Sequence, residues 1–230
     1  MNQRGGRTLG IVDLIEANTL DAPLAAYLWE KIDAGCSFLT AARPGGAGKS
    51  TVLANMLNFL PAGTAIRTVA SVRDLPNPPA SDTCYLAHEI GSGPYFAYLW
   101  GAEARRFLEL PATFGPESFR VASCLHADTP DELRSILTAP PNSLSDEAVL
   151  SIGLIVFVRI EMAGGIRRRV GSVYERHGTR HRLAYEWDAS ADIFLSRNGV
   201  TPSPDRTATI RALQDGGVRD FRETRRLLTG

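Results

Sequence analysis

One short segment combines the residue types that together bind phosphate groups. It runs through Pro44, Gly45, Gly46, Ala47, Gly48, Lys49, Ser50 and Thr51. Small residues allow consecutive backbone N–H groups to turn toward an anion, and a helix that begins here adds the positive end of its dipole. Lys49 could then contact the terminal phosphates of a nucleotide, while the hydroxyl of Ser50 binds Mg²⁺. The alternative is a flexible glycine-rich loop without a ligand.

Two further side chains follow predicted strands. The buried strand predicted over 83–87 ends in His88 and Glu89, and the strand predicted over 119–125 ends in His126. Ligands of open α/β sheets bind at the carboxyl ends of the strands. Glu89 could therefore contribute to a Mg²⁺ site or polarise an attacking water, and His126 could hydrogen-bond a γ-phosphate or Glu89. The alternatives are a solvated acid at a strand end and a histidine satisfied beside a helix cap.

The remaining candidates are an aspartate and a run of arginines. Asp74 lies in a proline-containing loop and is either a second acid on the magnesium side or a turn aspartate. Arg167, Arg168 and Arg169 fall in a predicted strand, so Arg167 and Arg169 point to one face and Arg168 to the other. They could reach the phosphate of a neighbouring subunit, or they form a charged edge that prevents aggregation.

The elements that must position these residues alternate between strand and helix. A helix capped by Asp21 precedes a short strand at 37–41, the phosphate-binding segment and a second helix. Strands are predicted at 64–72, 83–87 and 119–125, with a helix starting at Gly91 and another capped by Thr129. This alternation predicts an α/β fold with a mostly parallel sheet covered on both faces.

After residue 145 the pattern changes. A long strand at 150–162, a turn at Gly164–Gly165 and a partner strand at 166–174 predict an antiparallel addition, and the chain ends in helices between 202 and 228. We therefore divide the chain into residues 1–145, a P-loop core with lead-in helices, and residues 146–230, a β-hairpin extension with C-terminal helices of the same domain.

Composition excludes several classes of protein. The 230 residues contain 44% hydrophobic residues and 25 basic against 25 acidic residues, as in an ordinary globular chain. Without a basic excess, we expect no direct contact with nucleic acid. The three cysteines are widely spaced, which fits neither a disulfide framework nor a zinc site. We expect them to be buried, reduced thiols in the cytoplasm.

Taken together, these motifs resemble the GspE/PilT-type secretion ATPases, the motors of type II and type IV secretion, type IV pili and archaella. The resemblance is carried by the P-loop Gly45–Thr51, the Walker B-like His88-Glu89-Ile90, the His box Leu125-His126-Ala127-Asp128-Thr129, the late segments Arg167–Val170 and Glu186–Asp188, and the lead-in helices before the P-loop. It implies a RecA-like fold, binding of ATP and Mg²⁺, Glu89 as catalytic glutamate and His126 as γ-phosphate sensor.

The same resemblance implies an assembly. The family forms hexameric rings at the cytoplasmic face of the membrane and works with a polytopic inner-membrane platform protein. This chain corresponds to the C-terminal domain of the family, without the N-terminal domain that lends arginines to the phosphates. It also departs from the pattern at Arg43, where a loop glycine is usual, at Gly91, where arginine is usual, and at Arg73, where an acid is usual.

Three functions follow as hypotheses. The first is an ATP-hydrolysing motor subunit of a secretion or pilus machine. The second is a nucleotide-binding adaptor or regulator of such a machine with slow or no hydrolysis, which the departures from the family pattern favour. The third is a DNA-translocating ATPase, against which the neutral charge balance argues.

Overall fold

The computed structural model describes residues 8–76, 79–80, 82–115, 119–162 and 165–229. Its strands belong to one ten-stranded sheet, and they are β1 (Phe38–Ala41), β2 (Ala65–Thr68), β3 (Thr83–Leu86), β4 (Glu89–Ile90), β5 (Tyr98–Leu99), β6 (Arg120–Leu125), β7 (Leu154–Glu161), β8 (Arg167–His177), β9 (Arg180–Asp188) and β10 (Ile193–Ser196).

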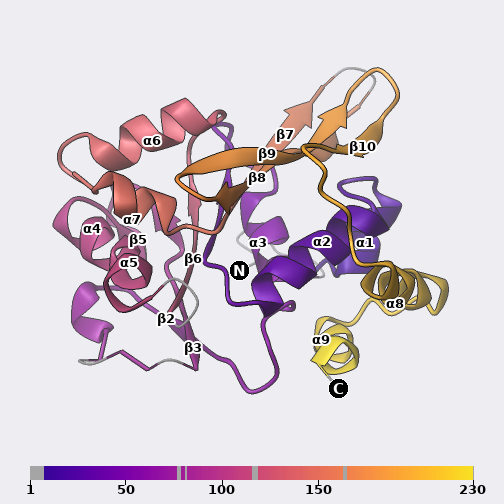
Figure 1. Cartoon of the computed structure of the whole chain (residues 1–230), viewed down its shortest axis with the longest axis horizontal. Coiled ribbons are helices and arrows are strands. Elements are labelled where there is room, and N and C mark those ends of the chain that lie inside the picture. The colour runs from indigo at the N-terminus through magenta and orange to yellow at the C-terminus, as the bar shows by residue number, and fades with distance from the viewer. Residues whose placement is uncertain (1–7, 77–78, 81, 116–118, 163–164, 230) are drawn as a thin grey trace.

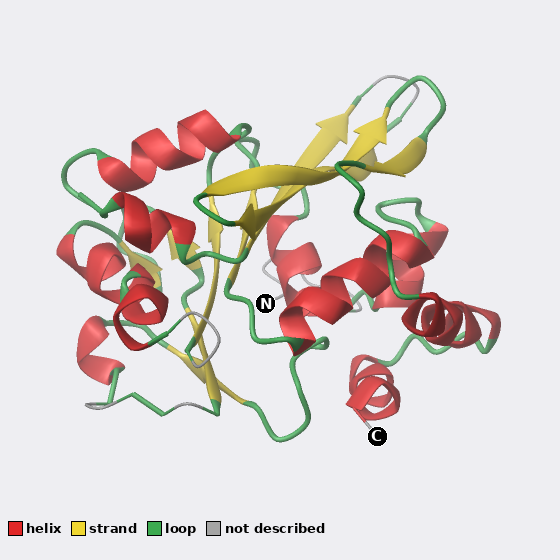
Figure 2. Cartoon of the chain, viewed as in Figure 1, coloured by secondary structure: helices red, strands yellow, loops and turns green. Residues whose placement is uncertain are grey.

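The helices cover both faces of this sheet (Figures 1 and 2). They are α1 (Ile11–Glu16), α2 (Ala22–Asp33), α3 (Lys49–Leu57), the 3-10 helix η1 (Val72–Asp74), α4 (Ala102–Leu108), α5 (Leu110–Phe114), α6 (Pro130–Thr138), α7 (Asp146–Leu150), α8 (Pro204–Asp215) and α9 (Phe221–Thr229).

The core of the sheet is parallel. Strands β7, β1, β6, β3 and β2 lie side by side in this order, each parallel to the next. Strands β8, β9 and β10 extend the sheet beyond β7 in antiparallel order. The predicted α/β class, with a mostly parallel sheet flanked by helices, a small antiparallel addition and C-terminal helices, is therefore confirmed.

The first strand shows why the core strands are apolar throughout. Phe38 packs into the cluster formed with α1, α2, α3, α8 and α9, while Leu39 packs into the opposite cluster with α4 to α7. Both side chains are fully buried. Because helices cover both faces of a parallel strand, successive residues are apolar instead of alternating with polar ones. This strand leads directly into the phosphate-binding segment.

Two predicted helix starts are confirmed. The carboxylate of Asp21 accepts a hydrogen bond from the backbone N–H of Leu24 at 2.9 Å, which caps α2. The hydroxyl of Thr129 accepts one from the N–H of Glu132 at 3.2 Å, which caps α6. The second cap fixes the turn that follows β6 and carries His126.

The helix predicted to start at Gly91 is wrong. The chain instead forms the parallel pair β4–β5, and helix α4 begins only after Gly101. The N–H of His88 bonds the carbonyl of Ala97 at 2.8 Å, so pairing across a loop replaces the expected helical bonds. Phe96 is consequently 73% exposed instead of facing the core.

Other boundaries differ in smaller ways. The strand predicted at 64–72 ends at Thr68, and the one predicted at 150–162 starts at Leu154 after helix α7. Gly164, in the predicted turn, lies outside the described residues. The sheet continues across residues 145 and 146, because β7 pairs with β1; the division of the chain at that point stays a prediction.

Candidate functional site

The phosphate-binding segment forms a tight loop between β1 and α3. Gly46 and Gly48 have φ angles of 78° and 104°, values that residues with a side chain rarely adopt. Gly48 is also the N-cap of α3, so the loop leads straight into the first turn of a nine-residue helix. The N–H groups of that turn lack helical partners and favour an anion. Pro44 and Gly45 are exposed at the outer rim, and Ala47 is buried.

Lys49 begins this helix and is almost completely buried, with 6% of its surface exposed. Its Nζ donates a hydrogen bond to the carbonyl of Ala42 at 3.0 Å. The same atom lies 3.3 and 3.4 Å from the two ring nitrogens of His126. Burial lowers the pKa of Lys49, and the negative charge of Glu89 opposes this shift. A buried ammonium that donates to one carbonyl can also donate hydrogen bonds to the oxygens of an anion.

His126 connects the loop to Glu89. Its Nδ1 donates to the carbonyl of Arg43 at 2.7 Å, and its Nε2 lies 3.0 Å from Oε1 of Glu89. A carbonyl only accepts, so Nδ1 carries a proton. The two residues singled out after separate strands thus lie in contact with each other beside Lys49.

Glu89 itself begins the short strand β4 instead of ending β3. Only 11% of its side chain is exposed. Besides His126, it accepts a hydrogen bond from the hydroxyl of Tyr98, whose pKa is raised by burial and by this carboxylate. A methyl group on Gly91 would come within 3.4 Å of Glu89 Oε1. The residue that departs from the family arginine therefore lies against the carboxylate.

The hydroxyl groups of the loop lie on the same helix turn. Ser50 is half-buried, with its Oγ 3.9 Å from the thiol of Cys124, and Thr51 is also half-buried. No cluster of three or more metal-binding side chains occurs among the residues that the structure describes. One hydroxyl and one carboxylate fit Mg²⁺ in its usual nucleotide-bound form, in which phosphates and waters supply the other ligands.

Arg43, the departure at the start of the loop, attaches the loop to the turn before α6. Its backbone N–H donates to Asp128 at 2.7 Å, and its guanidinium forms ion pairs with Asp128 and Glu132. Glu132 in turn accepts from the N–H of Asp128 at 2.8 Å. Together with the His126 bond to its carbonyl, these contacts hold Arg43 at both its backbone and its side chain. The arginine side chain therefore fixes the start of the loop, which a glycine at this position could not do.

The arginine run divides as the strand pattern predicts. Arg169 is buried and donates to Asp192 at 2.7 and 2.8 Å, and Arg167 approaches the same carboxylate at 4.0 Å. Arg168 points the other way and donates from Nε to the carbonyl of Gly46 at 3.0 Å. The three arginines are therefore not simply a charged strand edge. They are also not all directed at a neighbouring subunit, because Arg168 lies on the P-loop of its own chain.

Asp74 lies outside this arrangement. Its carboxylate accepts hydrogen bonds from the backbone N–H groups of Ala70 and Ser71, at 3.0 and 2.8 Å. These contacts are those of a turn aspartate, the second of the two roles considered for Asp74 from the sequence. Asp74 does not line the cavity over the loop.

A cavity of about 590 Å³ opens over the loop. The loop and Lys49 form one wall, and Glu89, Tyr98 and His126 form another. Arg167, Arg168 and Arg169 close it from β8, while apolar side chains of the N-terminal segment, Leu9 and Leu14, complete it. Four basic side chains line the cavity with one carboxylate, but Asp192 pairs with Arg169 and lies near Arg167, so the positive charge open to an anionic ligand comes mainly from Lys49 and Arg168. Its volume is within the range of small-molecule sites.

Sequence reasoning missed Tyr98 and the position of Arg168. Tyr98 contacts Glu89 only because β5 pairs with β4, and no local pattern indicates this pairing. Strand alternation separates Arg168 from its neighbours, but it does not say what lies against it. The predicted roles of Glu89, His126 and the loop residues stay predictions, although the structure brings Glu89, His126 and residues 45–51 to one cavity, which Pro44 does not line.

Comparisons with known proteins find structural likeness alone: a scan of protein-family models and a search of curated proteins give no match. The VirB11 ATPase of the Brucella suis type IV secretion system, solved in complex with sulphate, aligns with a TM-score of 0.48 and 18% identity. The Legionella pneumophila ATPase DotB aligns with a TM-score of 0.40 and 15% identity.

These alignments cover 72% and 88% of this chain but only 55% and 57% of the two solved chains. The chain therefore spans little more than half the length of each. No helix in the described part of the chain has the length and apolar character needed to cross a membrane.

Proposed function

We propose that this chain binds ATP with Mg²⁺ and hydrolyses it as a motor subunit of a type II or type IV secretion or pilus-type machine. The observation that supports this most is the cavity in which a left-handed glycine loop, a buried lysine and a histidine–glutamate pair meet. Each part is suited to a polyphosphate. The loop and helix start hold the phosphates, and Lys49 neutralises their charge.

Hydrolysis requires a water oxygen to attack the γ-phosphorus while the bond to the β–γ bridging oxygen breaks. In this proposal Glu89 accepts the proton of that water, and ADP and phosphate leave. His126, which is bonded to both Arg43 and Glu89, holds the carboxylate in place and changes partners when a γ-phosphate is present. Ser50 and Glu89 would hold Mg²⁺, which would neutralise phosphate charge when bound.

Turnover measurements test this proposal. Glu89→Gln keeps the size of the side chain but removes the base, so we expect phosphate release to fall by about 10²- to 10⁴-fold while ATP binding remains. Glu147→Gln, on the exposed surface of α7, is the matched control and should behave as the wild type. Hydrolysis by Glu89→Gln at the wild-type rate would refute the role of Glu89.

A nucleotide-binding adaptor is the second candidate. The contacts of Glu89 with both His126 and Tyr98 favour it, because these two partners compete with an attacking water for the carboxylate oxygens. A wild-type chain that binds ATP but releases no phosphate, alone or with its partners, would identify the adaptor. Measurable turnover would favour the motor.

The assembly follows from the family resemblance. We propose a homo-hexamer at the cytoplasmic face of the membrane, working on a polytopic inner-membrane platform protein and without direct contact with nucleic acid. Mass measurement with and without Mg-ATP tests the ring. A chain that stays monomeric in both conditions would contradict it.

A further inference from the structure

We propose that Arg168 binds the terminal phosphates of the nucleotide in cis, from the β8 strand of the same chain. This inference rests on the proposed function, and it assigns to one arginine the role that the family resemblance gives to arginines of another domain. It is carried by the placement of Arg168 on the loop, the absence of an ion-paired carboxylate among the described residues and the geometry of the strand that presents it.

The placement puts a cation directly over the anion-binding loop. Arg168 Nε donates to the carbonyl of Gly46 at 3.0 Å, and a methyl group on Gly48 would meet Arg168 Cδ at 3.3 Å. The side chain therefore crosses both glycines with left-handed backbone. It lines the same cavity as Lys49 and Glu89. A guanidinium has five N–H donors, so the single bond to Gly46 leaves most of them for phosphate oxygens.

The charge balance separates Arg168 from its neighbours. Arg169 is neutralised by Asp192 at 2.7 Å, and Arg167 lies 4.0 Å from both Glu161 and Asp192. Among the described residues, no carboxylate forms an ion pair with Arg168. An unpaired guanidinium against a carbonyl oxygen is weakly held, and a di- or triphosphate offers it charged, bidentate hydrogen bonds instead.

The orientation of Arg168 is built into the sheet. Pairing between β7 and β8 shifts by one residue between Phe157 and Val158, which leaves Gly171 without a partner in β7. A shift of one residue exchanges the two faces of a strand. This bulge therefore determines that Arg168, and not Arg167 or Arg169, faces the loop. Gly171 also has no room for a side chain, because an added methyl group would lie 2.6 Å from Arg159 Cγ.

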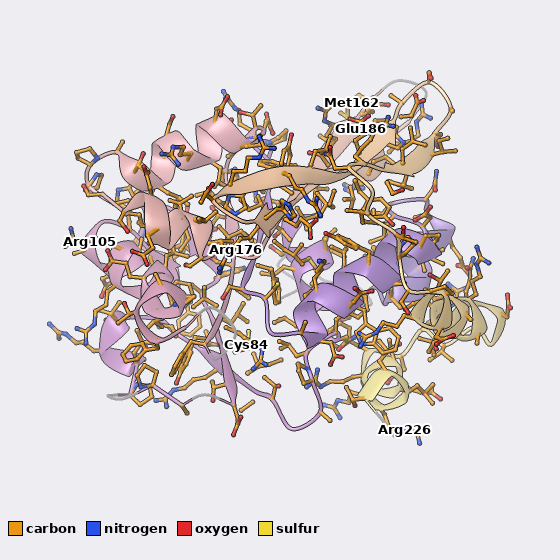
Figure 3. All side chains as sticks on the ribbon, in the orientation of Figure 1. Cys84, Arg105, Met162, Arg176, Glu186 and Arg226 are labelled. Atoms are coloured by element: carbon orange, nitrogen blue, oxygen red, sulfur yellow. The ribbon has the colours of Figure 1, made fainter. Side chains whose placement is uncertain are left out.

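The test compares affinities for Mg-ATP and Mg-ADP by titration with a fluorescent nucleotide. Arg168→Ala should weaken ATP binding by about tenfold or more, as expected for lost charged hydrogen bonds, and should weaken ADP binding less, because ADP lacks the γ-phosphate. Arg168→Lys keeps the charge and should recover part of the loss. The matched control is Arg176→Ala, an exposed arginine of the same strand; Figure 3 labels it at the end of β8 away from Met162.

The outcomes separate this inference from the proposed function. If the wild type binds no ATP, both fall. If the wild type binds ATP and folded Arg168→Ala binds ATP and ADP with wild-type constants, only the role of Arg168 is refuted. Equal losses for ATP and ADP without recovery in Arg168→Lys would also refute it, because they indicate a structural effect on the loop. If Arg168→Ala does not fold, Arg168→Gln takes its place in the same comparison.

Discussion

Replacing Lys49 by methionine separates the binding role of this residue from its effect on stability. Methionine has a similar length and suits the buried position, where Lys49 is only 6% exposed. The variant loses one charged hydrogen bond to Ala42 but no longer buries an ammonium. These effects oppose each other, so without nucleotide we expect the free energy of unfolding to change by less than about 1 kcal/mol.

The effect on nucleotide binding should be large by comparison. A ligand present at about 100 times its Kd stabilises the folded state by about 2.7 kcal/mol. For a domain of this size, that raises the Tm by roughly 5 to 10 °C. Two lost hydrogen bonds to phosphate, each worth about 1.5 to 3 kcal/mol, weaken binding by at least about 10²-fold. At the same ATP concentration, the Lys49→Met variant should therefore lose most of its Tm shift.

Thermal unfolding with and without Mg-ATP measures both effects. Lys31→Met is the matched control, since Lys31 is the only other lysine of the chain. It pairs with the buried Glu175 at 2.8 Å, so this variant should start from a lower Tm yet keep the full ATP-induced shift. A Lys49→Met variant that keeps that shift would refute the role of Lys49 in binding. If the free energy of unfolding of Lys49→Met without nucleotide falls by several kcal/mol, the expected cancellation between the lost hydrogen bond and the relief of burying an ammonium is refuted.

The pH dependence of stability gives a second readout of the same variant. Burial lowers the pKa of Lys49 in the folded state from its ordinary value of 10.5. Between the two values the unfolded chain binds more protons than the folded chain, so stability from this group rises with pH. Wild-type protein should show this rise as pH approaches 10.5, and Lys49→Met should lack it.

Two further predictions concern the contacts around the cavity. Arg43→Gly removes ion pairs to Asp128 and Glu132 from a side chain that is 67% exposed. At low salt the free energy of unfolding should fall by about 1 to 2 kcal/mol, mostly because glycine has more conformational entropy in the unfolded chain and partly because the weak ion pairs are lost. An unchanged Tm would contradict this. Asp192→Asn tests the ion pair with the buried Arg169. Hydrogen bonds from Arg169 hold the pKa of Asp192 well below 3.8, so the free energy of unfolding of the wild type should fall as pH drops below about 3.8. The variant should show a flatter pH profile, and equal profiles would refute the contribution of the ion pair to stability.

Much of the parallel core could be predicted from local patterns. Glycine spacing, a following lysine and helical periodicity are all local, and they located the loop before α3. Asp21 and Thr129 cap helices as predicted because a cap depends on residues three apart. The two segments also bring Glu89 and His126 together as expected, although Glu89 begins β4, which pairs with the end of β6 at Ile90 and Leu125, instead of ending β3.

The parts that were missed depend on pairing over longer distances. The segment after Glu89 has apolar residues at helical spacing, yet the pairing of β4 with β5 competes successfully with a helix and brings Tyr98 to Glu89. The face of Arg168 depends on a bulge at Gly171, which a single sequence does not reveal. Arg43 stands where the pattern expects glycine, and its carboxylate partners come from a distant turn that the loop sequence does not indicate.

Binding of a nucleotide by this loop can be measured by calorimetric titration of Mg-ATP into the folded wild-type chain. We expect saturable heat with one site per chain, and little or none for Lys49→Met. Absence of any heat for the folded wild type, at protein and nucleotide concentrations sufficient for a micromolar site, would contradict the claim that this loop binds a nucleotide.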